Sequence, residues 1–194
     1  MPYLTIDPRA VLTKLVEWID AEEPVIEEVF RFSGDWDAWA HHQFARWLQR
    51  DLRPPDGVDP LDVVTRIGRL WTGDAVTPVF RQDPTVPADL VFNLGAAADD
   101  APPLVVVQLR CDASARTWHD YVADLGADVA RLRGISPDLV PPPRRRGTAA
   151  VAVGVHRVDA HRVVAPGFAA TFAGRRHVVQ WWADFPSWER LRTS

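Results

Sequence analysis

Apolar and polar residues in the first part of the chain alternate with the period of an α-helix. Asp7-Pro8 is a typical helix start, and apolar residues follow at helical spacing from Val11 to Ile19. Pro24 is expected to interrupt this helix, which resumes over 25–32. Gly34 and Asp35 open a second predicted helix that ends near Leu52. Its apolar stripe consists of Trp36, Ala40, Phe44, Trp47 and Leu48. The segment 61–70 fits a further short helix.

The period then changes to that of β-strands. VTPVFRQ and ADLVFNL predict a strand pair around a proline-containing turn, and LVVVQLR is the most strand-like segment of all. A third helix follows, capped by Asp112 or Ser114 and ending near Gly134, and TAAVAVGVHRV and HVVQWWADF predict two more strands. This order predicts a mixed central β-sheet flanked by helices, an α/β domain. We expect an N-terminal helical appendage over 1–32 and the α/β domain over 33–194, joined in one compact unit.

Composition adds limits on the class of protein. The chain has 194 residues, 47% of them hydrophobic and 25% charged, which is typical of a globular domain. Its net charge of −4 gives no general attraction to nucleic acid, so such binding would need a local basic patch. Cys111 is the single cysteine, and neither a signal peptide nor an apolar run of about 18 residues is present. We therefore expect a cytoplasmic protein without membrane contact.

Nine tryptophans raise the question of an aromatic binding surface. Trp36, Trp39 and Trp47 fall at helical spacing, and Trp118 begins another apolar stripe. Packing is therefore the favoured interpretation, and Trp36, Trp47 and Trp118 are expected to be mostly buried.

The strand LVVVQLRC contains the main candidate for chemistry. Gln108 and Arg110 interrupt its apolar run, and because they are two residues apart they point to one face of the sheet. A buried strand breaks its pattern in this way where its end forms the wall of a site. The competing interpretation is the exposed face of an edge strand.

These segments resemble the PD-(D/E)XK nuclease superfamily, which has a restriction-endonuclease-like αβββαβ core. Asp89 of PADLVF falls at the PD position, split from Pro87 by Ala88, and Gln108-Leu109-Arg110 falls at the (D/E)xK position. GDWDAWAHHQFARWL is similar to a GGWEGWAQVEL-type helix, with Gln43 at its glutamate position, and QLRCDAS to an ELKCES-type ending. The resemblance spans about 33–155. It implies a catalytic set of Asp89, Gln108, Arg110 and Gln43, with Mg²⁺ or Mn²⁺ held by Asp89 and Gln108.

The chain departs from this pattern at three of its four positions. Gln43 carries no charge, Gln108 offers only an amide oxygen, and Arg110 keeps a positive charge but cannot shuttle protons. Only Asp89 remains as an anionic ligand, so a weakened or lost metal site is favoured. Each residue also has a purely structural interpretation: Asp89 as a turn or ion-pair residue, and Gln43 as a hydrogen-bond partner of nearby backbone.

Other chemistry is less well supported. Adjacent His41 and His42 do not share a helix face, so they do not form a zinc motif, and Cys111 is interpreted as a small structural residue. Two groups of arginines are candidates for contact with nucleic acid, although loop arginines are more often simply solvated. They are Arg144, Arg145 and Arg146, and Arg175 and Arg176.

Two functions remain open. The favoured one is a degenerate nuclease-like protein that acts without a cofactor as a binding or structural module for a protein or nucleic-acid partner. The alternative is a Mg²⁺- or Mn²⁺-dependent nuclease acting on DNA or RNA. Fold resemblance alone does not decide between them.

Overall fold

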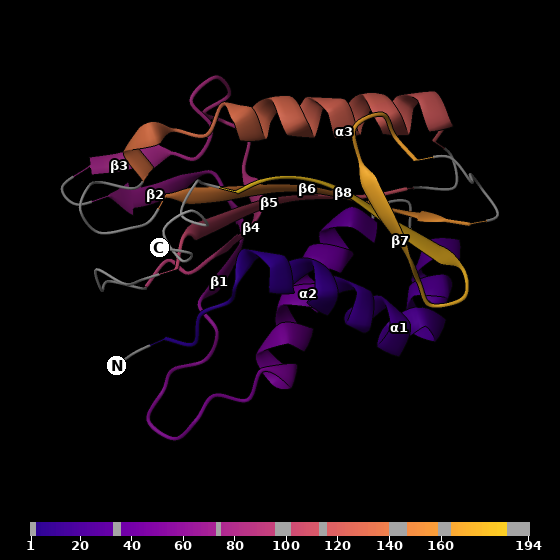
Figure 1. Ribbon diagram of the computed structural model, residues 1–194, viewed down its shortest axis with the longest axis horizontal. Helices are drawn as coiled ribbons and strands as arrows, with labels where there is room; N and C mark the ends of the chain where they lie inside the picture. The colour runs from indigo at the N-terminus through magenta and orange to yellow at the C-terminus, as the bar shows by residue number, and fades with distance from the viewer. Residues whose placement is uncertain are drawn as a thin grey trace, which may run out of the picture.

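A six-stranded β-sheet with helices on both faces organises the molecule. The computed structural model describes residues 3–32, 36–72, 75–95, 102–112, 116–139, 147–158 and 164–185. Figure 1 shows α3 (Trp118–Arg133) along one face of the sheet, and α1 (Pro8–Phe32) and α2 (Trp36–Asp51) along the other. The predicted mixed sheet between helices is confirmed.

The sheet is antiparallel except at its centre. The strand order is β1-β4-β5-β6-β8-β7, and the only parallel pair among the described strands is β5 with β6. Parallel neighbours need a crossover connection, which α3 provides. The bounds are β1 Val63–Ile67, β4 Ala88–Phe92, β5 Leu104–Cys111, β6 Thr148–Arg157, β7 Ala169–Ala173 and β8 His177–Asp184.

The continuous apolar run of β5 is explained by its central position, because both of its faces are covered. Val105, Val107 and Leu109 pack in the core under α1 and α2, whereas Leu104 and Val106 pack in the core under α3. A strand buried on both sides needs apolar residues at every position rather than at alternate ones. The polar residues Gln108 and Arg110 therefore stand out at its C-terminal end.

α1 is one helix of 25 residues, with Pro24 inside it. The prediction that Pro24 interrupts the helix was wrong. Proline costs about 3 kcal/mol inside a helix, but Ile19 before it and Ile26 after it are both fully buried in the core shared with α2 and the sheet. Burial of such side chains stabilises by roughly 1.5–3 kcal/mol each, enough to hold both halves in line. α1 thus belongs to the same core as the segment 33–194.

The prediction of a helix over 61–70 was also wrong, because this segment forms β1 and then β2 (Arg69–Thr72). β-branched residues dominate VVTRI, and they lose less freedom on a pleated sheet than in a helix. β3 (Ala75–Pro78) pairs with β2, whereas β4 pairs with β1 and β5, so the predicted pairing of VTPVFRQ with ADLVFNL was wrong as well.

The remaining predicted elements are confirmed in β5, α3, β6 and β8. Thr117 caps α3 instead of Asp112, and Ser114 lies outside the described residues. β7 and the short 3₁₀ helix η1 (Pro137–Leu139) were not predicted. Trp36 is fully buried and Trp47 and Trp118 are half-buried, whereas Trp71 on β2 is 74% exposed.

Candidate functional site

Asp89 lies where β4 and β5 separate. The paired residues of the two strands run from Phe92↔Val105 to Leu90↔Val107. At the next position the Asp89 side chain takes over the role of a β4 backbone carbonyl as hydrogen-bond acceptor, because its Oδ2 accepts the N–H of Leu109 at 3.0 Å. The carboxylate therefore sits against the C-terminal end of β5, between the positions of Gln108 and Arg110.

α2 supplies side chains to the rest of this open strand edge. His41 Nε2 lies 2.9 Å from the Leu109 carbonyl oxygen, Asp37 Oδ1 accepts the Cys111 N–H at 2.5 Å, and Trp36 Nε1 donates to the Asp112 carbonyl at 2.7 Å. Buried backbone groups need hydrogen-bond partners, and here helix side chains satisfy those that β4 leaves unpaired. His41 also lies 3.7 Å from Asp89 Oδ2, so α2, β4 and β5 meet at this point.

Asp37 and His41 are site residues that the sequence analysis missed. They are four residues apart on a helix and so share one face, and this spacing is the signal that could have identified them. Gln43, the predicted α2 residue, is partly buried and only two residues from His41, which places it on a different face. The side chains that contact β5 from α2 are therefore those of Trp36, Asp37 and His41.

Gln108 uses its amide group to hold the backbone before β4. Its side chain is 3% exposed, and its Nε2 donates to the Pro87 carbonyl at 3.2 Å. This contact ties the end of β5 to the segment that precedes Asp89. Asp89, Gln108 and Arg110 thus all lie at one end of the sheet.

Arg110 is held by carboxylates from two helices. Its Nε and Nη2 donate to Asp128 Oδ2 and Oδ1 of α3 at 3.1 and 3.0 Å, and its Nη1 lies 3.6 Å from Asp37 Oδ2. Asp128 is 1% exposed and also accepts from Arg131 Nη1 at 2.6 Å. Two parallel hydrogen bonds to a buried carboxylate form the strongest type of arginine pair. Although burial opposes its charge, the hydrogen bonds that Arg110 donates to Asp128 raise the pKa of Arg110 above the ordinary value.

The carboxyl groups of the site hold their protons more tightly than usual. Burial raises the pKa of Asp89 from 3.8 to about 6, against the opposing effects of His41 and the Leu109 N–H. Burial likewise raises the pKa of Asp37 and of Asp128, against their hydrogen bonds with Cys111 and Arg110 respectively. A carboxyl group with a pKa of about 6 can exchange a proton near neutral pH, which suits acid–base chemistry.

The backbone opposite Asp89 is unusual. In the pairing of β1 with β4, Thr65 faces Leu90 and Ile67 faces Ala88, so Arg66 lies across from Asp89. Arg66 has a φ of 52°, in the left-handed region that non-glycine residues seldom adopt. Such conformations occur more often at functional sites than elsewhere.

The side chains at this site that could act as metal ligands make other contacts in this structure. Among the described residues no group of three or more His, Cys, Asp or Glu side chains is placed to hold one. One oxygen each of Asp37 and Asp89 is occupied by a backbone N–H, and the Gln108 amide contacts Pro87. The predicted pair Asp89 and Gln108 would need further ligands.

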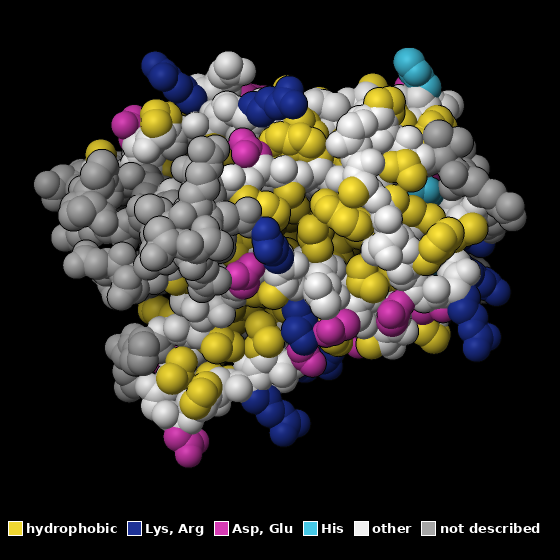
Figure 2. All heavy atoms as spheres, in the orientation of Figure 1, with side chains coloured by type: hydrophobic (Ala, Val, Ile, Leu, Met, Phe, Trp, Pro, Cys, Tyr) yellow, Lys and Arg dark blue, Asp and Glu magenta, His cyan; other side chains and the backbone are white. Residues whose placement is uncertain are grey.

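Only two of the predicted basic residues, Arg175 and Arg176, belong to the described part of the chain. Arg144, Arg145 and Arg146 are outside the described residues. Arg175 and Arg176 follow β7, where their backbone N–H groups donate to Glu23 Oε1 at 2.8 and 3.0 Å, and Arg176 Nη1 donates to Glu27 Oε2 at 3.1 Å. Basic and acidic side chains lie side by side at the lower right of Figure 2, where Figure 1 places α1 and the β7–β8 turn.

Comparison with known proteins adds no assignment. No known protein family, curated protein or solved structure matches this chain. None of the helices in the described part of the chain combines the length and apolar character required to cross a membrane.

Proposed function

We propose that this protein is a degenerate relative of the PD-(D/E)XK nucleases that acts as a binding or structural module for a protein or nucleic-acid partner. The topology supports the relationship. A helix precedes the antiparallel strands β1, β4 and β5, and α3 then leads to β6 alongside β5, which is the αβββαβ order. The convergence of Asp89, Gln108 and Arg110 at one end of this core supports it further.

The Arg110–Asp128 pair is the observation on which the degenerate interpretation rests. A catalytic cation must be free to face the developing charge of a phosphate. Here both donor positions on one side of the guanidinium are used by Asp128, and Asp37 lies near the other side. A cation enclosed by two carboxylates contributes mainly to the structure, and breaking such a buried pair is costly.

A working nuclease is the second candidate, and a specific observation favours it. Asp37, His41 and Asp89 meet at the open edge of β5, and the pKa of Asp89 is about 6. In this alternative Mg²⁺ or Mn²⁺ would be recruited together with the substrate phosphate, since Mg²⁺ is often held by one or two carboxylates plus substrate oxygens.

Cleavage of plasmid DNA, single-stranded DNA and RNA with Mg²⁺ or Mn²⁺ separates the two functions. The variants to compare with the wild type are Asp89→Ala, Asp37→Ala and, as a control on an exposed turn, Asp56→Ala. We expect no metal-dependent cutting by the wild type. Cutting that is lost in Asp89→Ala but kept in Asp56→Ala would overturn the degenerate interpretation.

Fluorescence anisotropy with labelled oligonucleotides tests the partner. Binding that weakens steeply between about 50 and about 200 mM salt would identify nucleic acid as the partner, because basic side chains that neutralise phosphates release counterions. Absence of binding at low salt would exclude the nucleic-acid partner and leave the protein partner.

A further inference from the structure

β7 is the last strand of the sheet, and its outer edge is unprotected. None of the other described strands pairs with this edge, and the residues from Ala169 to Phe172 are all exposed. Proteins usually protect such an edge with a charged residue, a proline or a distorted backbone. At the opposite edge of the sheet, β1 contains the exposed Arg66 in a left-handed conformation. The sequence AATFA of β7 has none of these devices, so β7 is available for pairing with a further strand.

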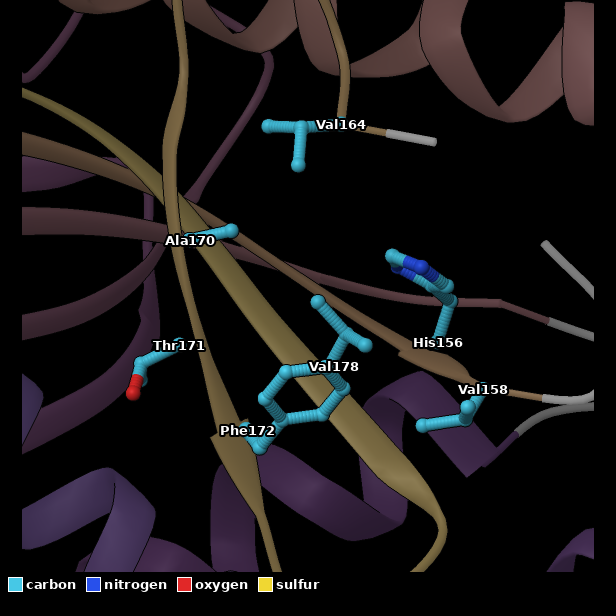
Figure 3. Close-up of a pocket in the computed structure, with 7 residues that line it drawn as sticks. All are labelled: His156, Val158, Val164, Ala170, Thr171, Phe172 and Val178. Carbon is cyan, nitrogen blue, oxygen red and sulfur yellow. The ribbon is translucent and has the colours of Figure 1, made fainter. Parts of the chain in front are cut away.

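Largely apolar cavities reach β7 from both faces of the sheet. On the α3 side, Ala170 and Phe172 line a cavity of about 570 Å³. On the α1 side, Thr171 lines a second cavity of about 260 Å³ together with Leu12 and Val16 of α1. Figure 3 shows the side chains of Ala170 and Thr171 pointing to opposite sides of β7. Successive side chains of a strand point to alternate faces, so a strand added to β7 would direct side chains toward both cavities.

The order of large and small side chains on β7 fits a second copy of the same strand. In an antiparallel pair with a two-fold axis at Thr171, each Phe172 lies opposite Ala170 of the other copy. Phe172 is 71% exposed, and the single methyl group of Ala170 leaves space for a large neighbour. The two Phe172 side chains are then diagonal neighbours, which is within the reach of aromatic rings. β7 is therefore complementary to itself in this register, and no like charges face each other across the pair.

From these observations we propose that two copies of this chain pair through β7 and form a symmetric dimer whose sheet continues from one copy into the other. Backbone hydrogen bonds between the two β7 strands hold the copies together, and Phe172 of each copy packs beside Ala170 of the other. Because β8, β6 and β5 lie between β7 and β4, this interface is separate from Asp89. The inference does not depend on the proposed function.

Sedimentation velocity over a range of protein concentrations tests this inference. We expect the wild type to dimerise and Phe172→Lys to weaken the dimer about a hundredfold, because two Phe172 side chains lose their burial in each dimer. Val76→Lys on the exposed hairpin strand β3 is the matched control and should dimerise like the wild type. Circular dichroism verifies that both variants are folded. A wild type that stays monomeric at every concentration would overturn the proposal, and so would equal dimerisation of Phe172→Lys.

Cysteine cross-linking tests the register of the two strands. Thr171→Cys places two thiols at the two-fold axis, where facing Cβ atoms lie about 4.5–5.5 Å apart and a disulfide can form on oxidation with diamide. Ala169→Cys is the control on the same face of β7, because its two thiols would be about 14 Å apart. The native Cys111 is buried, so the introduced thiols are the accessible ones. We expect disulfide-linked dimers from Thr171→Cys and none from Ala169→Cys, and any other pattern would overturn this pairing.

Discussion

The carboxylate of Asp89 accepts a backbone hydrogen bond at the end of β5, where the pairing with β4 has ended. Its hydrogen bond to Leu109 and its contact with His41 join β4, β5 and α2. The same burial that makes this bond effective raises the pKa of Asp89 to about 6. The protonation of a single residue is therefore coupled to the stability of the whole sheet end.

The contribution of Asp89 to stability should fall as the pH rises from 4 to 7, whereas Glu23 and His177, whose pKa values are lowered, act in the opposite direction. A carboxyl with a raised pKa binds its proton more tightly in the folded chain than in the unfolded chain. The stabilisation that comes from this tighter proton binding is fully present below the pKa of the carboxyl in the unfolded chain. It is lost as the pH rises through the pKa in the folded chain, which is about 6 for Asp89, and the loss amounts to at most about 3 kcal/mol. Asp37 and Asp128, whose pKa values are also raised, act in the same direction.

Urea denaturation at a series of pH values measures this effect. Asp89→Asn keeps an acceptor oxygen but cannot titrate, so relative to the wild type its free energy of unfolding should increase between pH 4 and pH 7, by up to about 3 kcal/mol. Asp56→Asn on an exposed turn is the matched control and should follow the wild type. Identical pH profiles for wild type and Asp89→Asn would contradict the assignment.

Removal of the Asp128 carboxylate should be strongly destabilising. Asp128→Ala leaves Arg110 and Arg131 without their shared partner, and breaking a buried pair costs about 3–5 kcal/mol. The exposed pair Arg50–Glu22 provides the comparison, since Arg50→Met should change stability by less than about 1 kcal/mol. Equal free energies of unfolding for the two variants would show that Asp128 has no special role.

At the scale of the elements, sequence patterns predicted the central strands and α3 because their periodicity is strong and uninterrupted. The segment 61–70 was misassigned because its apolar spacing fits a helix as well as a strand, and pairing of β1 with β4 decided the outcome. The partner of β3 depends on how the chain folds back at Gly68, whose carbonyl accepts the Val79 N–H. Local patterns do not contain that information.

Like the strands and helices, the residues of the candidate site could be predicted from the sequence only in part. Gln108 and Arg110 were chosen as candidates because they interrupt an apolar strand, and Asp89 because it falls at the PD position of the nuclease-like pattern. Asp37 and His41 were missed because their role depends on which edge of β5 lacks a neighbouring strand. Asp128 was missed for the same kind of reason, since only the crossover of α3 brings it to Arg110.

Pro24 offers a test of how α1 is held together. Because Pro24 is exposed and lacks an N–H, Pro24→Ala should restore one helix hydrogen bond and raise the free energy of unfolding by about 1–3 kcal/mol. The neighbouring exposed position serves as the control, with Ala21→Gly expected to lower it by about 1 kcal/mol. A loss of stability in Pro24→Ala would mean that the proline contributes to the fold.

On the scale of the whole molecule, α1 is part of the main core. Trp18, Ile19 and Ile26 are fully buried there together with residues of α2 and the sheet. At roughly 1.5–3 kcal/mol for each buried side chain, their combined contribution is comparable with the total stability of a typical domain.

Deletion of residues 1–32 should therefore abolish cooperative folding. We expect the shortened chain to lose its near-ultraviolet circular dichroism and to unfold without a sharp transition in urea. A cooperative transition in the shortened chain would instead establish that 33–194 folds independently and that α1 is an appendage.

The hydrogen bond between Leu109 and Asp89 also makes one backbone proton a natural reporter. An amide proton bound to a carboxylate resonates at a frequency that follows the charge of that carboxylate, so the Leu109 signal should titrate with the pKa of Asp89. The same proton is shielded from exchange with solvent only while β4, β5 and α2 stay together. One resonance thus records both the ionisation of the site and the opening of the sheet end around it.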